Sequence, residues 1–342
     1  MQRCFDLARL GAGRTSPNPM VGAVLTYRNR IIGEGYHQAY GQAHAEVNAV
    51  NSVKESDRHL LPYSTLYVSL EPCNIHRNTP PCTLLILQER IPRVVISYID
   101  HTPGVDGSGV ARLREAGVDV VVGVLRQSGQ QLSQARNTFV QEHRPYIILK
   151  YAQSADGFFA PEDNVQQWLS NAYSKRLVHK WRSEVDAILV GANTVLADNP
   201  RLNNRLYFGA SPCRIILDRD ASLPGGLNVF DGAQPTLVFS EHLSAKAGER
   251  PANTERILLP FDDQLLPELL RRLASQNIST LLVEGGLKTM QRFLNEGLWD
   301  EARVFTAEKT IGKGRPAPTL PCPAERSFAL GSDRLQWYRR RF

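Results

Sequence analysis

The sequence lacks a long hydrophobic run. No stretch of its 342 residues reaches the roughly 18 consecutive apolar residues that a membrane-spanning helix needs. The first residues, MQRCFDLARLGAG, carry charges where a signal peptide has an apolar run, and their apolar residues have the spacing of a helix. We therefore expect a cytoplasmic protein with no membrane partner.

Cysteine is scarce, and no segment is of low complexity. The five cysteines are an odd number without regular spacing, which argues against a disulfide scaffold. Apolar residues make up 42% and charged residues 22% of the chain, and no polar tract or short repeat interrupts it, so we expect it to fold throughout. At about 100 to 200 residues per domain, the length favours two domains.

Charge of one sign is not concentrated either. The formal net charge of +6 comes from 40 Lys and Arg against 34 Asp and Glu, and the densest basic run lies at residues 339–341. Such an excess is typical of a solvated surface and does not require a polyanionic partner. We expect no nucleic-acid partner, and a phosphorylated small molecule remains compatible with this charge.

Two series of helices and strands are present. The first alternates short Val- and Ile-rich runs with helical segments up to about residue 144, and the second begins with YIILKYAQ and alternates in the same way. Alternation of this kind indicates α/β layers with mostly parallel sheets. Because QEHRP, residues 141–145, is where one series stops and the next starts, we predict domains at residues 1–144 and 145–342.

Three residues of the first domain have the spacing of a catalytic zinc site. His44 opens a predicted helix, and Cys73 and Cys82 follow a strand and precede another helix, with Pro81 suited to the first turn of the latter. Zinc favours imidazole and thiolate ligands, and three protein ligands leave the fourth position for water. The pattern therefore predicts an open zinc site.

Glu46 lies two residues after His44, in the first turn of the same predicted helix. A carboxylate beside the metal takes a proton from the attacking water and delivers protons to the ring nitrogen and the departing amine. The H-x-E and P-C…C arrangement predicts a zinc-dependent deaminase, although eight residues, NIHRNTPP, separate the cysteines. Two alternatives stay open: a closed structural site with His37 or His76 as fourth ligand, and three residues that never meet.

The motifs of this domain resemble a known family. TSPNPMVGAVL, GEGYHQAYGQAHAE and SLEPCNIHRNTPPC are similar to the bifunctional riboflavin-biosynthesis deaminase/reductases, and the resemblance continues through YIILKYAQSADG, HKWRSEVDAILVGANTVLADNPRL and LLVEGG. It implies a cytidine-deaminase-like α/β/α sandwich followed by a dihydrofolate-reductase-like α/β domain. It also implies a homo-oligomer built through the second domain, zinc in the first and NADPH in the second.

The implied activity has two steps. A pyrimidine with a ribosylamino-phosphate arm loses an amino group, and NADPH then reduces the ribosyl arm to ribityl.

In the first domain the resemblance implies that Asn18 holds the pyrimidine edge and that His76 and Thr79 approach the phosphate. Asn18 lies between two prolines and is also suited to capping a turn. The loop departs from the family at Asn74, Ile75, Arg77 and Asn78.

In the second domain VEGG is a strand that runs into glycines at a helix start, which lets backbone N–H groups approach a pyrophosphate; a plain tight turn is the alternative. The resemblance implies two sets of residues here. Those near NADPH are Gln153, Trp168, Thr194, Asp198 and Gly286, and those that bind the substrate are Arg182, Leu202, Arg205 and Glu284.

Departures from the family are more numerous in this half, at Phe158, Gln166 and Glu308. They leave open a second domain that is weakened, or that serves only in oligomerisation. A zinc deaminase of nucleic acid is a further alternative, which the second α/β domain disfavours, and a purely structural zinc protein is the last. The leading hypothesis is the two-step enzyme.

Overall fold

The computed structural model describes residues 1–76, 80–162, 169–242 and 251–340. The chain forms two compact units, Met1–Arg144 and Pro145–Phe342, each with its own sheet and core. Among the described residues, no helix has the length and apolar character needed to cross a membrane.

The sheet of the first unit has five strands in the order β2-β1-β3-β4-β5. Their bounds are β1 Gly22–Tyr27, β2 Arg30–Tyr36, β3 Thr65–Leu70, β4 Arg93–Tyr98 and β5 Asp119–Val122. β3, β4 and β5 run parallel, and β2 points the same way, so four of the five strands share one direction, as expected for a mostly parallel sheet; β1 alone is reversed, antiparallel to both β2 and β3. The reason is the two-residue turn: Arg28 and Asn29 both have positive φ, which closes a tight antiparallel hairpin.

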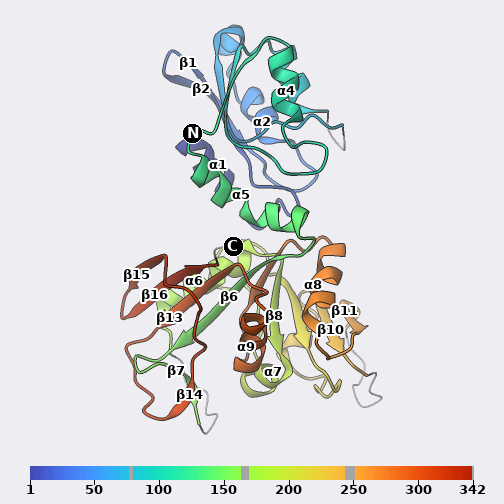
Figure 1. Ribbon diagram of the computed structural model, residues 1–342, viewed down its shortest axis with the longest axis vertical. Helices are drawn as coiled ribbons and strands as arrows, with labels where there is room; N and C mark the ends of the chain where they lie inside the picture. Colours follow the sequence, from blue (N-terminus) through green and yellow to red (C-terminus); the bar gives the residue numbers. More distant parts are fainter. Residues whose placement is uncertain (77–79, 163–168, 243–250, 341–342) are drawn as a thin grey trace. The chain divides into compact units, whose positions relative to one another are not determined.

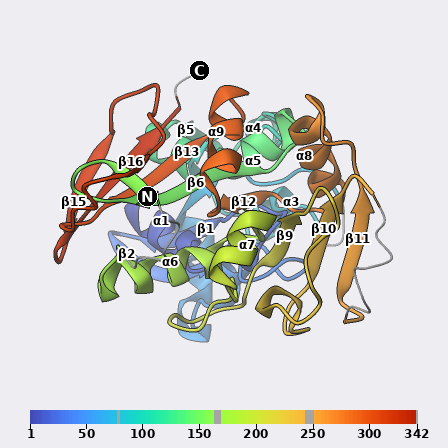
Figure 2. The same ribbon diagram turned by 90° about the horizontal axis from the view of Figure 1, so that it is seen from below.

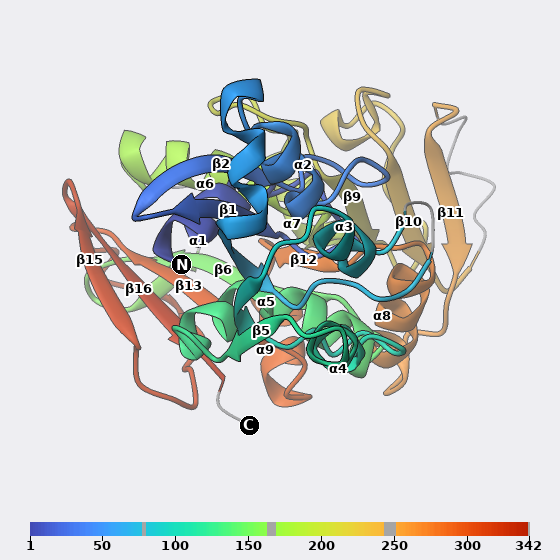
Figure 3. The ribbon, with the colours of Figure 1, turned by 90° about the horizontal axis from the view of Figure 1, so that it is seen from above.

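Helices cover both faces of this sheet. On one face lie α1, Gln2–Arg9, and α5, Arg126–Gln141, and on the other lie α2, Ala45–Asn51, and α4, Ser108–Glu115 (Figure 1). The alternation of buried residues in β1 explains this layering, because Ala23 and Leu25 join the core under α2 while Val24 packs against α1. α3, Cys82–Gln88, lies beside α2 (Figure 3), so the two helix starts that carry His44 and Cys82 come together.

A buried carboxylate fixes the loop that follows β3. Glu71 is 4% exposed, and its two oxygens accept hydrogen bonds from the backbone N–H groups of Asp100, Gly107, Gly109 and Val110 at 2.9 to 3.3 Å. These donors include the first turn of α4, where a negative charge is favourable. Glu71 therefore ties the end of β3 to the loop 100–110, and Cys73 follows two residues later.

The second unit is built on a nine-stranded sheet in the order β11-β10-β9-β8-β12-β6-β13-β16-β15 (Figure 2). The seven strands from β11 to β13 are parallel, and β16 and β15 form an antiparallel hairpin at one edge. Their bounds are β6 Tyr146–Gln153, β8 Ala187–Gly191, β9 Cys213–Leu217, β10 Thr236–Ser240, β11 Thr254–Leu258, β12 Thr280–Val283, β13 Glu301–Thr306, β15 Arg326–Leu330 and β16 Asp333–Arg339. A small two-stranded sheet joins β7, Phe158–Pro161, to β14, Gly314–Pro316.

The helices of this unit lie on both faces of the large sheet. The main core includes leucines of α8, Leu265–Ser275, and Met290 and Phe293 of α9, Leu287–Asn295. α6, Ala172–Glu184, packs Trp181 against Phe305 and Trp337, on the face opposite the core residue Val304. α7, Ala192–Asp198, directly follows β8. This unit also contains the 3-10 segment Asn228–Phe230, and the first unit contains the 3-10 segment Glu55–Tyr63.

We predict that Glu71→Gln loosens the loop 100–110 and lowers the free energy of unfolding of the first unit by about 2 kcal/mol, because an amide cannot accept every bond that a carboxylate accepts. Hydrogen exchange at the amides of Asp100, Gly107 and Gly109 should accelerate. The control is Glu115→Gln, an exposed change on α4. Equal exchange in both variants would contradict this role of Glu71.

Candidate functional site

The first site lies where α2 and α3 begin. His44 is the N-cap of α2, Cys82 is the first residue of α3, and Cys73 follows β3. The ligand atoms of these three residues all lie within 4.8 Å of one another, with His44 Nδ1 3.3 Å from Cys82 Sγ and 3.5 Å from Cys73 Sγ. Pro81 is the N-cap of α3, one position before the first turn where the sequence suggested it. The three residues therefore do meet, as the sequence predicted.

The donor set fits zinc. One imidazole nitrogen and two sulfurs are the soft ligands that zinc selects, and three of them leave a position open. The hydrogen bond between the two cysteines lowers the pKa of the Cys73 thiol, which His44 also lowers, and raises the pKa of Cys82. The backbone N–H of Cys82 donates to Cys73 Sγ at 3.3 Å, which also favours a thiolate at Cys73.

Glu46 is the second residue of α2 and is 3% exposed. Burial raises the pKa of its carboxyl to about 6, and His44 opposes this shift. A carboxyl with a pKa near the pH of the cell can both take and give a proton. Glu46 thus lies beside the three ligands, with chemistry suited to moving protons.

His37 is not a fourth ligand, because both of its ring nitrogens are in use. Nδ1 lies 3.0 Å from the Ala43 carbonyl oxygen, which only accepts, so Nδ1 carries the proton. Nε2 then accepts from the Asn18 amide nitrogen at 3.2 Å, a bond that does not use Asn18 Oδ1. Burial lowers the pKa of His37, in agreement with a neutral ring. The closed site through His37 is therefore not supported.

The loop between the cysteines is held at its beginning. Asn74 Oδ1 accepts hydrogen bonds from Thr83 Oγ1 at 3.1 Å and from Arg112 Nη1 at 2.9 Å. His76 is exposed, and it is absent from the group of potential metal ligands in the described part of the chain. Thr79, like Arg77 and Asn78, lies outside the described residues.

The second site is a pocket of about 1620 Å³ in the second unit. It lies at the carboxyl ends of the parallel strands β6, β8, β9 and β12, where α/β folds bind their ligands. The pocket is larger than a typical single-ligand site of about 300 to 1,000 Å³. It therefore has room for two ligands together.

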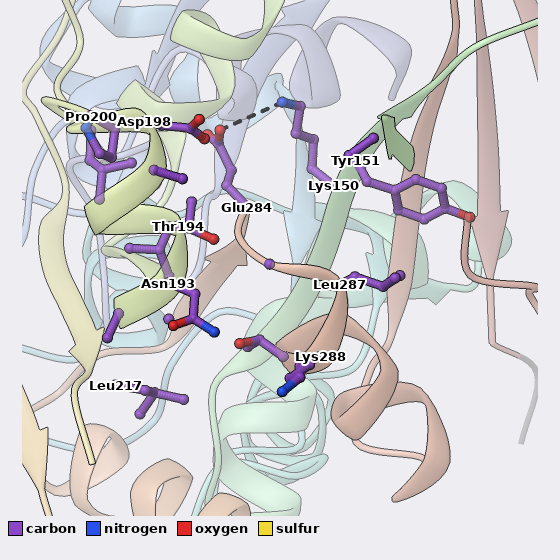
Figure 4. Close-up of a pocket in the computed structure, with 18 of the residues that line it drawn as sticks. Lys150, Tyr151, Asn193, Thr194, Asp198, Pro200, Leu217, Glu284, Leu287 and Lys288 are labelled. Atoms are coloured by element: carbon purple, nitrogen blue, oxygen red, sulfur yellow. Dashed lines mark ion pairs between the residues drawn. The ribbon is translucent and has the colours of Figure 1, made fainter. Parts of the chain in front are cut away.

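Glu284 is a buried anion of this pocket. Arg182 donates two hydrogen bonds to its oxygens, at 2.8 and 2.9 Å, and Lys150 Nζ lies 3.6 Å away. Burial opposes its ionisation, but Arg182 and Lys150 outweigh burial and lower the pKa of Glu284 to about 2. Figure 4 shows Lys150 and Glu284 turned toward each other.

Two more predicted residues line this pocket next to Arg182. Leu202 is 3% exposed with positive φ, and Arg205 follows it in the loop after α7. His179, which the sequence reasoning missed, accepts the Arg205 backbone N–H at its Nδ1 at 3.1 Å. Burial, Arg182 and Arg205 lower the pKa of His179 to about 4.

The other end of the pocket is a glycine turn. Gly286 has φ +73° and precedes α9, and a Cβ there would lie 3.0 Å from Thr194 Oγ1. Figure 4 shows Thr194 on α7, with the first residues of α9, Leu287 and Lys288, at the same pocket. A side chain would fill this turn, whereas glycine leaves the backbone N–H groups open to a ligand. Asp198 of α7 also lines the pocket.

One residue that was predicted to lie near NADPH does not line the pocket, and another is not described. Gln153 Nε2 donates to Thr306 Oγ1 at 3.2 Å, and Gln153 is not among the pocket residues. Trp168 lies outside the described residues, as does Gln166. Of the departures from the family, Phe158 begins β7 and Glu308 is exposed on the surface.

Lys150 and His179 are the residues that the sequence reasoning missed. Lys150 stands in a predicted strand, YIILKYAQ, where a single lysine in an apolar run was a usable signal. His179 gave no signal, because its partner is set by a tertiary contact. His37 was considered only as a fourth zinc ligand, and its hydrogen bond with Asn18 was not predicted.

Comparisons with known proteins match both units of the chain. Residues 1–98 match the cytidine and deoxycytidylate deaminase zinc-binding region, and residues 145–326 match the RibD C-terminal domain. The riboflavin biosynthesis protein RibD of Aquifex aeolicus is 38% identical over 92% of this chain and 87% of its own length. That of Escherichia coli is 34% identical over 94% of this chain and 90% of its own.

Solved structures match nearly the whole chain as well. A diaminohydroxyphosphoribosylaminopyrimidine deaminase/5-amino-6-(5-phosphoribosylamino)uracil reductase from Thermotoga maritima is 37% identical, covers 99% of this chain and 97% of its own, and has a TM-score of 0.89. Acinetobacter baumannii RibD is 29% identical, with a TM-score of 0.87 over 98% of this chain and 96% of its own.

These findings confirm the predicted fold class, a cytidine-deaminase-like domain and a dihydrofolate-reductase-like domain, and the predicted cofactors zinc and NADPH. They do not favour the nucleic-acid deaminase or a non-catalytic second half. The chain belongs to the RibD family of riboflavin-biosynthesis enzymes, in which a zinc-dependent pyrimidine deaminase and an NADPH-dependent reductase are joined in one polypeptide.

Proposed function

We propose that the first unit carries the deaminase, with His44, Cys73 and Cys82 as zinc ligands and Glu46 as the proton-transfer residue. The observation that carries this proposal is the cluster of three ligand atoms within 4.8 Å of one another, beside a carboxylate that is 3% exposed. Zinc, when bound, lowers the pKa of water to about 7 and so supplies a nucleophile at cellular pH.

Glu46 then moves the protons of the reaction. Its carboxylate takes a proton from the attacking water and delivers protons to the ring nitrogen and to the departing amine. Its burial keeps solvent from competing for those protons. Asn18 holds the pyrimidine edge through Oδ1, which the hydrogen bond to His37 leaves free. His76 and Thr79 are proposed to approach the phosphate.

The second unit is proposed to reduce the ribosyl arm. NADPH, when bound, supplies the hydride. Gly286 offers backbone N–H groups to its phosphates, with Thr194 and Asp198 of α7 nearby and Gln153 and Trp168 as further proposed contacts. Lys150, which the sequence reasoning missed, joins Glu284 at the pocket.

Arg182, Leu202, Arg205 and Glu284 are proposed to bind the phosphorylated pyrimidine. Two guanidinium groups suit a phosphate arm, because they make charge-assisted hydrogen bonds with its oxygens. Glu284 stays ionised and holds Arg182 in place. The substrate therefore meets the guanidinium of Arg182, which Glu284 holds in place, and the guanidinium of Arg205, which is exposed.

A homo-oligomer through the second unit and a cytoplasmic location complete the proposal. The edge strand β15 leaves Phe328 44% exposed, and a second copy paired there would cover this side chain. The five cysteines form no disulfide, as is usual in a reducing compartment. Light scattering of the purified enzyme tests the oligomer, and a monomer would contradict it.

We predict that Glu46→Gln keeps its zinc and loses ammonia release by about a hundred- to ten-thousandfold, because the amide cannot accept a proton. The assay follows ammonia from the diaminopyrimidine phosphate, with metal content measured in parallel. Glu55→Gln, an exposed change in the same unit, is the control. A Glu46 variant with full zinc and full activity would end the assignment.

Zinc removal should separate the two activities. We expect a chelator to abolish ammonia release while NADPH oxidation with the deaminated substrate continues, because the two sites lie in different units. Added zinc should restore the first activity. Parallel loss of NADPH oxidation would show that the reductase also depends on the metal.

We predict that Gly286→Ala weakens NADPH binding about tenfold or more, because a side chain at φ +73° is strained and its Cβ meets Thr194. Gly226→Ala is the matched control, since a Cβ there meets no atom within 4 Å. Binding is measured by NADPH fluorescence titration. Equal affinity in the two variants would argue against a phosphate cradle at this turn.

A further inference from the structure

One face of α6 holds the loop 203–209 at three points. His179, Arg182 and Ser183 are three and four residues apart, so they share this face. Arg182 Nη1 donates to the Asn203 carbonyl oxygen at 3.1 Å, and the Arg205 backbone N–H donates to His179 Nδ1 at 3.1 Å. Gly209 closes the contact: its φ is +108°, and a Cβ there would lie 2.9 Å from Ser183 Cβ.

The loop holds itself together around Asn204. The Asn204 amide nitrogen donates to the carbonyl oxygens of Phe208 and Gly209 at 3.3 and 3.1 Å, and its oxygen accepts from the Tyr207 backbone N–H at 3.2 Å. Burial contributes little, because Leu206 is 48%, Tyr207 39% and Phe208 86% exposed. The position of the loop therefore depends on its polar attachments to α6.

The attachment at His179 fixes the state of the ring. A backbone N–H only donates, so Nδ1 carries the lone pair and the proton resides on Nε2. The ring is 4% exposed and lies close to Lys150, Arg182, Arg205 and Glu284. Burial and the neighbouring arginines lower the pKa of His179 to about 4, which agrees with the neutral form. A neutral ring binds the loop without adding another positive charge.

Arg205 is the positively charged residue whose backbone N–H is held by His179. Its Nη1 donates to Asn203 Oδ1 at 2.9 Å, and among the described residues it forms no ion pair. The Arg182 charge, by contrast, is balanced by Glu284. Burial and the charges of Arg182 and Arg201 lower the pKa of Arg205, so its surroundings favour an anionic ligand.

We propose that His179 is a positioning residue of the reductase, which holds the Arg205 amide so that the Arg205 guanidinium binds the phosphate arm of the substrate. This rests on the proposed binding of that arm by Arg182 and Arg205. His179 acts through Arg205 and needs no contact with the hydride or with NADPH. Its loss therefore weakens the affinity for the phosphorylated substrate and leaves the chemical step unchanged.

Two conservative substitutions separate this role from direct contact with the substrate. Asparagine places an amide atom where Nδ1 stands, so His179→Asn retains an acceptor for the Arg205 N–H. Glutamine places its amide atom where Nε2 stands, so His179→Gln loses that acceptor and retains only a polar group in the pocket. If His179 instead contacted the substrate through Nε2, His179→Gln would retain the affinity for the substrate and His179→Asn would lose it.

The experiment uses the full chain with the deaminated substrate, so that the first unit is not needed. NADPH oxidation should show a KM for that substrate near the wild-type value in His179→Asn and about tenfold higher in His179→Gln, with kcat and the KM for NADPH unchanged in both. Lys180→Gln is the control on the same helix, since Lys180 pairs with Glu184 and does not line the pocket.

Binding of ribose 5-phosphate, measured by calorimetry, is the second readout and does not depend on turnover. It should be weakened by His179→Gln and by Arg205→Gln, and not by His179→Asn. The positioning role is overturned if both histidine variants weaken binding equally, or if His179→Gln binds ribose 5-phosphate more tightly than His179→Asn. If the wild type binds ribose 5-phosphate in this pattern but oxidises no NADPH, the proposed reductase fails and the role of His179 stands.

Discussion

A buried carboxylate at the end of a central strand organises each unit. Glu71 directly follows β3, the middle strand of five, and Glu284 directly follows β12, the middle strand of nine. Both lie where a bare charge is strongly unfavourable, so each requires partners. Glu71 takes four backbone N–H groups and Glu284 takes Arg182 and Lys150. The residues that satisfy them are those that shape the loops at each site.

The two carboxylates solve the same problem with different donors. Glu71 is neutralised by peptide dipoles, which fix a backbone and add no charge to the site beside it. Glu284 is neutralised by side-chain cations, which lie within the pocket and remain close to a ligand. The first arrangement suits a loop that must hold a metal ligand, and the second suits a pocket for an anionic substrate.

How much could be predicted from the sequence depended on how local each feature is. His44 and Glu46 are neighbours, and the two cysteines flank one loop, so spacing alone placed them around a metal. Arg182 and Glu284 are separated by 102 residues; the family resemblance named each as a substrate-binding residue, but their ion pair was not predicted. The attachment of Arg205 to His179 left no trace in spacing or composition, because a backbone donor is present at any residue.

The same distinction applies to the fold. Strands with strong apolar patterns were predicted, including β3, β6 and β12, and so was the start of α2. The helix α5, rich in Gln and Ser, and the mostly exposed strand β15 were not, because their sequences have little apolar periodicity. The direction of β1 could not be derived from its composition, since it depends on the two-residue turn after it.

The size of the pocket in the second unit has a consequence for inhibition. Its 1620 Å³ are lined both by the glycine turn at α9 and by Arg182 of α6 and Arg205 of the loop after α7. One compound that joins a dinucleotide mimic to a sugar-phosphate mimic would therefore occupy both ends of a single space. Such a bisubstrate ligand loses its translational freedom once, whereas two separate molecules lose it twice.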